Sequence, residues 1–284
     1  MKTKLIMVEG IPGSGKTTFA RKIADYYRNR GVAVNLYNEG QAHPADLAWS
    51  ACVPLNRLGA LLKKYDGLEN EIRENMHIDG DYAIIAYTQV KTENREFYKE
   101  LENYEVYDNR VAFDVFCRLH ISRWDTFGKQ AVEKDELNIF ECAFLQNHIN
   151  ELQNFQLASK TDIEKHLNKL LSSVLGLSPV LIYLSQPDIR ETIDRIAKER
   201  VSEHGNWMDM ASKYVENSPY GKANGLRGFD GLIRCIEDRK KIELGVLKSL
   251  PISSIIIENT EYDWESVWKS IEAYLKTIFA NTVE

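Results

Sequence analysis

The chain has 284 residues, of which 44% are hydrophobic and 27% charged, and these values exclude a disordered chain, a collagen-like chain and a disulfide-stapled miniprotein. With 36 Lys and Arg against 42 Asp and Glu, the formal net charge is −6, which disfavours a non-specific binder of nucleic acid or membranes. A local basic pocket for a phosphorylated ligand is compatible with this charge.

The cysteines and the apolar runs indicate the compartment. Cys52, Cys117, Cys142 and Cys235 are too far apart in the sequence for a CxxC pair or a zinc spacing, so we expect buried free thiols. The apolar run over residues 5–8 is too short for the hydrophobic region of a signal peptide, and no stretch approaches the ~18 apolar residues of a membrane span. We expect a cytoplasmic protein that does not bind membranes.

The first 40 residues alternate strand and helix. Residues 5–8 form an apolar run that ends at a Gly/Pro cluster, which is typical of a strand buried on both faces of a parallel sheet. Residues 16–30 carry apolar side chains at helical spacing, and residues 32–37 read as a second strand. Together they predict a βαβ unit.

Residues 44–130 interrupt this alternation. Their pattern is mostly helical, with helices expected over 45–64, broken at Pro54, and over 111–127. The pattern leaves the state of residues 79–90 open. We therefore predict a helical insertion that is too long for a simple crossover between strands.

The alternation resumes at residue 137. Strands are predicted over 137–140, 179–184 and 252–257, and helices over 161–175 (with Thr161 or Asp162 as the N-cap), 187–201, 231–250 and 264–279. Residues 202–230 are rich in Gly, Asn and Ser and are expected to be mobile. Five strands separated by helices predict a single α/β domain over 1–284, with a five-stranded parallel sheet flanked by helices.

One motif carries recognisable chemistry. Residues Gly10 to Thr17 fit the Walker A pattern GxxxxGK[ST] at every fixed position. The glycines let the backbone turn so that its N–H groups point at phosphate oxygens, and the following helix directs its positive end to the same anion. Lys16 would add a charge for the β and γ phosphates, and the Thr17 hydroxyl could ligate Mg²⁺. We predict nucleotide-binding residues at Pro12, Gly13, Ser14, Gly15, Lys16, Thr17 and Thr18.

The stretch from Val8 to Thr18 resembles the start of P-loop small-molecule kinases, which include thymidylate kinases, deoxynucleoside kinases and phosphotransferases of the chloramphenicol type. The match is close over residues 5–30, and the order of elements agrees over most of the chain. The resemblance implies a P-loop NTPase fold, a helical insertion on the substrate side at 44–130 and a helical lid with its following helix at 186–250. It also implies ATP as the phosphate donor and Mg²⁺ as a cofactor, without assigning a subfamily.

Two acids follow predicted strands. Glu39 stands where kinases resembling this chain place a carboxylate that faces the acceptor hydroxyl, so it could accept the proton of that hydroxyl; the alternative is a solvated loop acid. The position of Glu141 resembles that of the acid that closes the Walker B strand, which would hold Mg²⁺ or the substrate. Nucleoside kinases often have Arg after this Glu, whereas Cys142 follows here.

Basic residues supply the remaining candidates. The helix at 187–201 resembles the lid of nucleotide kinases, and Arg195 and Arg200 are our candidates for phosphate contacts, with exposed i,i+4 ion pairs as the alternative. Arg123 is a candidate for an anionic group of the acceptor. For His43, an ordinary hydrogen-bonded loop histidine is the preferred interpretation.

The leading hypothesis is an enzyme that transfers the γ-phosphate of ATP to the hydroxyl or phosphate of a small molecule, for example a nucleoside, a nucleotide or an antibiotic. The alternatives are a P-loop ATPase or regulatory nucleotide switch that works on a partner, and a nucleotide-binding module without catalysis. No nucleic-acid polymer or membrane is expected as a partner, and both a monomer and a homodimer are compatible with the sequence.

Overall fold

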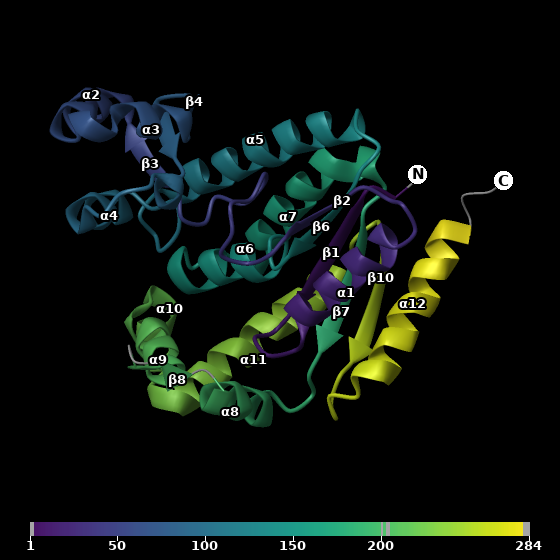
Figure 1. Cartoon of the computed structure of the whole chain (residues 1–284). Coiled ribbons are helices and arrows are strands. Elements are labelled where there is room, and N and C mark those ends of the chain that lie inside the picture. Colours follow the sequence, from purple (N-terminus) through teal and green to yellow (C-terminus); the bar gives the residue numbers. More distant parts are fainter. Residues whose placement is uncertain (1–2, 200, 203–204, 281–284) are drawn as a thin grey trace. The chain divides into compact units, whose positions relative to one another are not determined.

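The computed structural model describes residues 3–199, 201–202 and 205–280 of the chain (Figure 1). It divides into two compact units: Met1–Glu39 with Asp125–Glu284 form the first unit, and Gly40–Trp124 form the second unit. The boundary lies within one helix, α5 (Phe113–Val132). Among the described residues, no helix combines the length and the apolar composition that crossing a bilayer requires.

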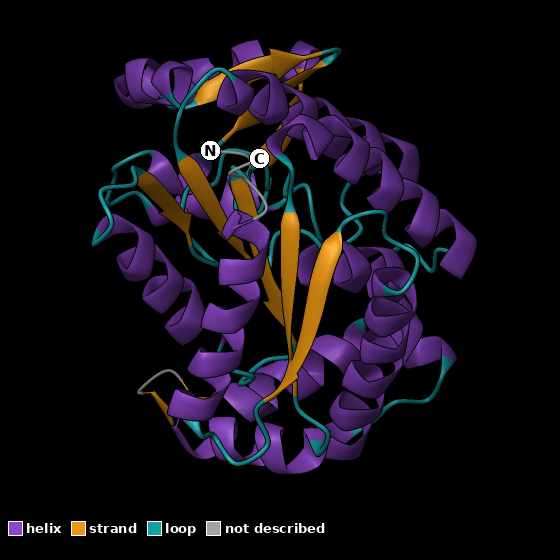
Figure 2. Ribbon diagram, turned by 90° about the vertical axis from the view of Figure 1, so that its right-hand side faces the viewer, coloured by secondary structure: helices purple, strands orange, loops and turns teal. Residues whose placement is uncertain are grey.

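The first unit is built on a parallel sheet of five strands, which Figure 2 shows flanked by helices. Across the sheet the order is β10 (Ser253–Glu258), β7 (Val180–Ser185), β1 (Leu5–Gly10), β6 (Leu137–Glu141) and β2 (Val34–Tyr37). All neighbouring pairs run parallel. These are the five predicted strands, and β1, β6 and β7 are buried along their whole length, which explains their apolar composition.

The strand order places β1 in the middle of the sheet. The chain continues from β1 toward β2 on one side and later crosses to β7 on the other side. In open α/β sheets, ligands bind outside the carboxyl ends of the strands at the point where the strand order reverses. The carboxyl end of β1 is therefore the position at which the fold itself predicts a ligand site.

Helices cover the sheet of the first unit. On one face, α1 (Lys16–Arg28) and α12 (Trp264–Ala280) bury side chains against the strands, among them Phe19, Ile23 and Ile271. On the other face, the Tyr183 hydroxyl of β7 donates to the carboxylate of Glu243, which belongs to α11 (Gly228–Leu247). The remaining helical elements described in this unit are the second part of α5, α6 (Gln146–Asn150), a π-helix at Glu151–Phe155, α7 (Lys160–Val174), a 3₁₀ turn at Leu175–Leu177, α8 (Ile189–Glu199), α9 (Trp207–Asn217) and α10 (Pro219–Ala223). A two-stranded ribbon, β8 (Val201–Ser202) and β9 (Gly205–Asn206), follows α8.

Two local features of the first unit differ from the sequence analysis. No helix was predicted over residues 202–230, but α9 and α10 occupy much of this stretch. Its Ser and Pro residues are helix-start signals, because the Ser218 hydroxyl caps α10 by accepting from the Gly221 N–H at 2.9 Å. The N-cap of α7 is Ser159 rather than Thr161 or Asp162, since the Ser159 hydroxyl accepts from the Asp162 N–H.

The second unit contains a sheet that the sequence analysis missed. Strands β3 (Ala51–Pro54), β5 (Tyr82–Ile85) and β4 (Met76–Asp79) pair antiparallel in this order. The helix expected over 45–64 begins only at Leu55, because Pro54 cannot continue a helix from the preceding residues and ends β3 instead. The helices of this unit are α2 (Leu55–Lys64), α3 (Glu69–Glu74), α4 (Arg95–Glu102) and the first part of α5, with short 3₁₀ turns at Asp66–Leu68 and Tyr87–Gln89.

A buried glutamate of the second unit predicts how stability changes with pH. Glu105 accepts from the Ser50 N–H and from the Tyr87 hydroxyl, and burial raises its pKa to about 7 from an ordinary value of 4.5. Between pH 4.5 and about 7, the folded chain therefore keeps the proton of the Glu105 carboxyl group, whereas the unfolded chain has lost it. The stability that Glu105 contributes is complete below pH 4.5 and is lost as the pH rises through 7.

We expect the substitution Glu105→Gln to remove this pH dependence. Between pH 4.5 and 7, the free energy of unfolding of the variant should rise relative to wild type by roughly 3 kcal/mol, since each unit of pKa shift corresponds to about 1.4 kcal/mol. Urea unfolding of both proteins at a series of pH values measures the difference. If the free energies of unfolding of the two proteins changed with pH in the same way, the raised pKa of Glu105 would be contradicted.

Candidate active site

The Walker A loop lies between β1 and α1, at the carboxyl end of the central strand. Gly10, Gly13 and Gly15 have φ values of +143°, +79° and +95°. A Cβ atom at Gly10 would lie 2.3 Å from the Leu184 carbonyl oxygen, so both the conformation and the space require glycine there. Gly15 caps α1 without a side-chain hydrogen bond, which leaves the first N–H groups of the helix available to an anion.

Residues after β10 hold the loop in this conformation. The Asn259 side chain donates to the Ser14 carbonyl oxygen at 3.2 Å, and the Tyr262 hydroxyl donates to the Gly13 carbonyl oxygen at 3.2 Å. The Ser14 hydroxyl is buried and has no hydrogen-bond partner among the described residues. A bound phosphate oxygen would satisfy it, which agrees with the predicted role of this loop.

Lys16 and Thr17 are the first two residues of α1 and follow the loop directly. The Lys16 side chain is buried, and its Nζ donates to the Ile11 carbonyl oxygen at 2.9 Å, which folds the amine back onto the loop. The Thr17 hydroxyl donates to the carboxylate of Glu141 at the end of β6. The structure thus brings together the two residues that were predicted to hold Mg²⁺, one from the start of α1 and one from the end of β6.

Glu39 joins the same cluster from the end of β2. Its backbone N–H donates to Glu141 at 3.4 Å, and its own carboxylate is exposed. The Gln146 side-chain amide donates to Glu39 Oε1 at 2.9 Å, and the Cys142 thiol donates to Glu39 Oε2 at 3.5 Å. The residue that replaces the Arg of nucleoside kinases therefore contacts the predicted base directly.

The donor set of this cluster fits Mg²⁺. Ligand atoms of Glu39, Glu141 and Cys142 lie within 4.8 Å of one another. Burial raises the pKa of the Cys142 thiol well above its usual range, so the thiol stays protonated and is a poor ligand for a hard cation. The hydroxyl of Thr17 and the two carboxylates are the oxygen ligands that Mg²⁺ prefers.

Of the two lid arginines predicted to contact phosphate, Arg195 belongs to the described residues and Arg200 does not. Arg195 lies on α8 and forms an exposed pair with Glu191 at 3.2 Å, as the i,i+4 alternative expected. Its guanidinium also stacks over the ring of Tyr262 at 3.8 Å, and that tyrosine donates to the Walker A loop. Arg195 is therefore linked to the loop through one side chain. Arg200 lies outside the described residues.

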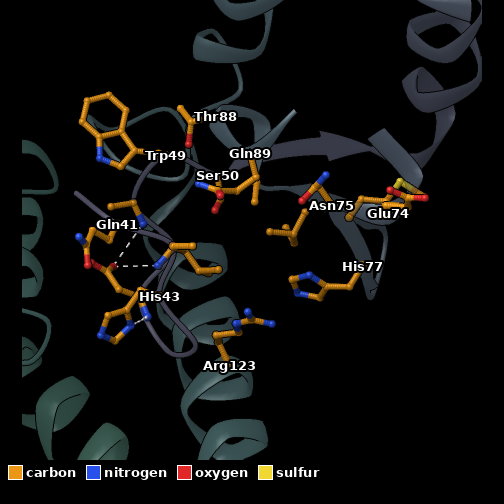
Figure 3. Close-up of a pocket in the computed structure, with 17 residues that line it drawn as sticks. Gln41, His43, Trp49, Ser50, Glu74, Asn75, His77, Thr88, Gln89 and Arg123 are labelled. Atoms are coloured by element: carbon orange, nitrogen blue, oxygen red, sulfur yellow. Dashed lines mark hydrogen bonds between the residues drawn. The ribbon is translucent and has the colours of Figure 1, made fainter. Parts of the chain in front are cut away.

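Arg123 belongs to the second unit, where it lines a cavity of about 350 Å³ (Figure 3). Its Nε is buried without a hydrogen-bond partner among the described residues, and burial lowers its pKa.

Two histidines line the same cavity. Burial and the Arg123 charge together lower the pKa of His43, to about 4, and that of His77. His43 Nδ1 accepts from two backbone N–H groups, which agrees with the preferred interpretation of a hydrogen-bonded loop histidine. Polar side chains complete the lining, including Gln41, Ser50, Asn75, Thr88 and Gln89.

The sequence analysis did not identify Glu9 and Gln146. Glu9 is fully buried in β1 and accepts from the backbone N–H groups of Phe144 and Gln146, and its burial raises its pKa to about 7. An acid inside an otherwise apolar strand is a signal that could have been used, because buried carboxylates need partners. Gln146 carried no such signal.

Several solved structures are similar to this chain at low identity. A similar solved structure is a deoxyadenosine kinase from M. mycoides with bound dATP, which is 15% identical, with 96% of this chain and 99% of that chain covered and a TM-score of 0.42. A thymidylate kinase from Ehrlichia chaffeensis is 12% identical, with 100% of both chains covered and a TM-score of 0.40. A thymidylate kinase from Candida albicans is 12% identical, with 96% of this chain and 92% of that chain covered and a TM-score of 0.40. No protein-family model matches the chain, and no curated protein matches it.

The fold and the loop together define the class. A parallel sheet in the order β10–β7–β1–β6–β2, with a Walker A loop after its central strand, is an α/β P-loop fold. The sheet order and the position of the loop agree with the P-loop fold that the sequence predicts.

Proposed function

We propose that the protein is a phosphotransferase that uses ATP and Mg²⁺ to phosphorylate a small molecule in the cytoplasm. The observation that carries this proposal is the convergence of Lys16, Thr17, Glu39 and Glu141 at the carboxyl ends of three adjacent strands, next to the free N–H groups of α1. A nucleotide-binding loop alone would not need an exposed, oriented carboxylate beside it. Glu39 supplies that carboxylate.

Each residue of this cluster has a distinct task. The loop N–H groups and the Lys16 ammonium hold the phosphates and stabilise charge that develops during transfer. Thr17 and Glu141 hold Mg²⁺, which neutralises phosphate charge when it is bound. Glu39 accepts the proton of the acceptor hydroxyl as the hydroxyl oxygen attacks the γ-phosphorus. The bond between the γ-phosphorus and the bridging oxygen of ADP then breaks.

Further residues are assigned to the two substrates. We assign Arg195, and Arg200 beyond the described residues, to phosphate contacts, because Arg195 is already linked to the loop through Tyr262. In the second unit, Arg123 is our candidate for an anionic group of the acceptor. An arginine whose buried Nε finds no partner in the described part of the chain is suited to such a group.

An antibiotic-modifying phosphotransferase and a nucleoside or nucleotide kinase would use this cluster in the same way, because they differ only in the acceptor. The alternative is an ATPase or a switch that acts on a partner, in which the Glu39 carboxylate would orient water instead of an acceptor hydroxyl. The transfer assay below separates this alternative from a kinase.

A ligand screen followed by a transfer assay tests the proposal. Thermal shift with Mg·ATP is measured for deoxyadenosine, thymidine, thymidine monophosphate, chloramphenicol and an aminoglycoside, and each stabilising compound is then incubated with γ-³²P-labelled ATP. We expect one compound class to stabilise only with nucleotide present and to become labelled. Steady release of inorganic phosphate without labelling of any acceptor would contradict the proposal and favour the ATPase.

A pair of arginines on one helix tests the lid. We expect Arg195→Ala to lower kcat by about 100-fold, because it removes a cation that would reach the transferred phosphate. The matched control is Arg190→Ala, since Arg190 also lies on α8 and forms an exposed pair with Asp230 at 2.6 Å. Equal kcat values for the two variants would show that Arg195 does not contribute to phosphate transfer.

A further inference from the structure

A buried acid lies directly before the Walker A loop. Glu9 belongs to β1 and has none of its surface exposed. Its Oε1 accepts from the Phe144 N–H at 2.8 Å, and its Oε2 accepts from the Gln146 N–H at 3.1 Å. Hydrogen bonds from backbone N–H groups to a carboxylate are stronger than those between neutral groups, so this single side chain holds two points of another segment.

That segment is the turn over residues 142–146, which connects β6 to α6. It begins at Cys142, whose φ of +65° lies in the left-handed region, and ends at Gln146, where α6 starts. All five residues of the turn are buried. Backbone hydrogen bonds from the Cys142 N–H to the Val8 carbonyl oxygen and from the Asn147 N–H to the Cys142 carbonyl oxygen, both at 3.2 Å, hold the start of this turn. The two hydrogen bonds to Glu9 hold its middle and its end.

The two ends of this turn hold the two oxygens of Glu39. The Gln146 amide donates to Glu39 Oε1 at 2.9 Å, and the Cys142 thiol donates to Glu39 Oε2 at 3.5 Å. Glu39 is exposed, and an exposed carboxylate samples several rotamers unless other groups restrain it. The orientation of Glu39 therefore depends on a turn whose position depends on Glu9.

We propose that Glu9 is a positioning residue for phosphoryl transfer, which fixes the 142–146 turn so that Gln146 and Cys142 orient the Glu39 carboxylate toward the acceptor hydroxyl. This inference rests on the proposed function, in which Glu39 is the base. Glu9 itself touches neither substrate nor metal. Its effect reaches the reaction through the backbone of the turn, and a catalytic group must be held within a fraction of an ångström to act efficiently.

The test is a double-mutant cycle with Glu9→Gln and Gln146→Ala. A glutamine at position 9 is nearly isosteric but presents an NH₂ group to one of the two backbone N–H donors, which releases one side of the turn. We expect each single variant to lower kcat by about tenfold with an unchanged KM for ATP. The double variant should also lose about tenfold rather than about 100-fold, because both changes disconnect Glu39 from the same turn.

Two controls separate positioning from general destabilisation. Ile271→Val truncates a fully buried side chain of α12 in the core beside the sheet and should lower Tm while kcat is unchanged. Hydrogen exchange of the peptide that covers residues 142–147 should accelerate in Glu9→Gln and stay at the wild-type rate in Ile271→Val. The assays use γ-³²P-labelled ATP and the compound of the panel above that wild type labels fastest.

The failure of this inference and the failure of the proposed function give different results. Normal labelling by wild type, with additive losses in the double variant or with kcat unchanged in Glu9→Gln, would overturn the role of Glu9 alone. No labelling of any compound by wild type would overturn the kinase proposal and this role with it. In that case, faster exchange in Glu9→Gln would still identify Glu9 as the group that holds the turn.

Discussion

Replacement of Lys16 by alanine is expected to lower the rate of phosphate transfer by about 10²–10³-fold while the fold is retained. The Lys16 ammonium is the charge that the loop directs at the phosphates, and in the structure it is buried and held by the Ile11 carbonyl oxygen at 2.9 Å. A nucleotide must draw the amine away from this oxygen, so the variant should lose ATP affinity as well as kcat. Calorimetric titration with Mg·ATP and single-turnover transfer measure the two losses separately.

The control for this experiment lies on the same helix. Lys22 belongs to α1, is exposed, and places its Nζ over the ring of Trp268 at 4.9 Å. Lys22→Ala removes one positive charge from the same helix and should leave both affinity and rate within a few-fold of wild type. A Lys16→Ala protein with the transfer rate of the Lys22→Ala protein would contradict the assignment of the loop as the phosphate site.

The parts of the site that could be predicted from the sequence are those with local chemistry. The Walker A loop is one continuous segment whose glycines, lysine and threonine must each be of that type. Glu39 and Glu141 could be found because each follows a strand, and the carboxyl ends of parallel strands meet at one edge of the sheet. Their direct contact through the Glu39 N–H agrees with that rule.

The contacts that were missed depend on tertiary structure. Gln146 lies 107 residues from Glu39 and 137 residues from Glu9, and nothing in the sequence around Gln146 indicates either contact. Glu9 was more accessible to prediction, because an ionisable residue within an apolar strand must find buried partners. The identity of those partners, two backbone N–H groups, could not be read from any residue type.

The strands of the second unit were also missed because they depend on tertiary structure. Residues 51–54 and 82–85 form paired strands, yet each segment is only four residues long and too short to show a periodic pattern. Their pairing depends on a chain reversal across α2 and α3, which short-range patterns do not report. By contrast, α1 and α12 of the first unit were predicted, because their apolar stripes repeat over several turns.

Glu39→Gln is the variant with the second large expected effect. We expect kcat to fall by about 10²–10⁴-fold, the contribution of a well-placed general base, with little change in ATP affinity. The glutamine can still accept from the Gln146 amide at the position of Oε1, so the turn and the fold should be preserved. Single-turnover transfer and calorimetric titration with Mg·ATP measure these quantities.

A titration with magnesium distinguishes the two roles that Glu39 could have. If its carboxylate acts mainly as a ligand in the cluster with Glu141, a higher Mg²⁺ concentration should restore the rate of Glu39→Gln by mass action. If it acts as the base, the rate stays low at every concentration, because no added cation replaces a proton acceptor. The control is Glu258→Gln, which neutralises an exposed acid at the carboxyl end of the edge strand β10 and should transfer phosphate like wild type. A Glu39→Gln protein that matches Glu258→Gln at the Mg²⁺ concentration of the standard Mg·ATP assay would exclude Glu39 from both roles.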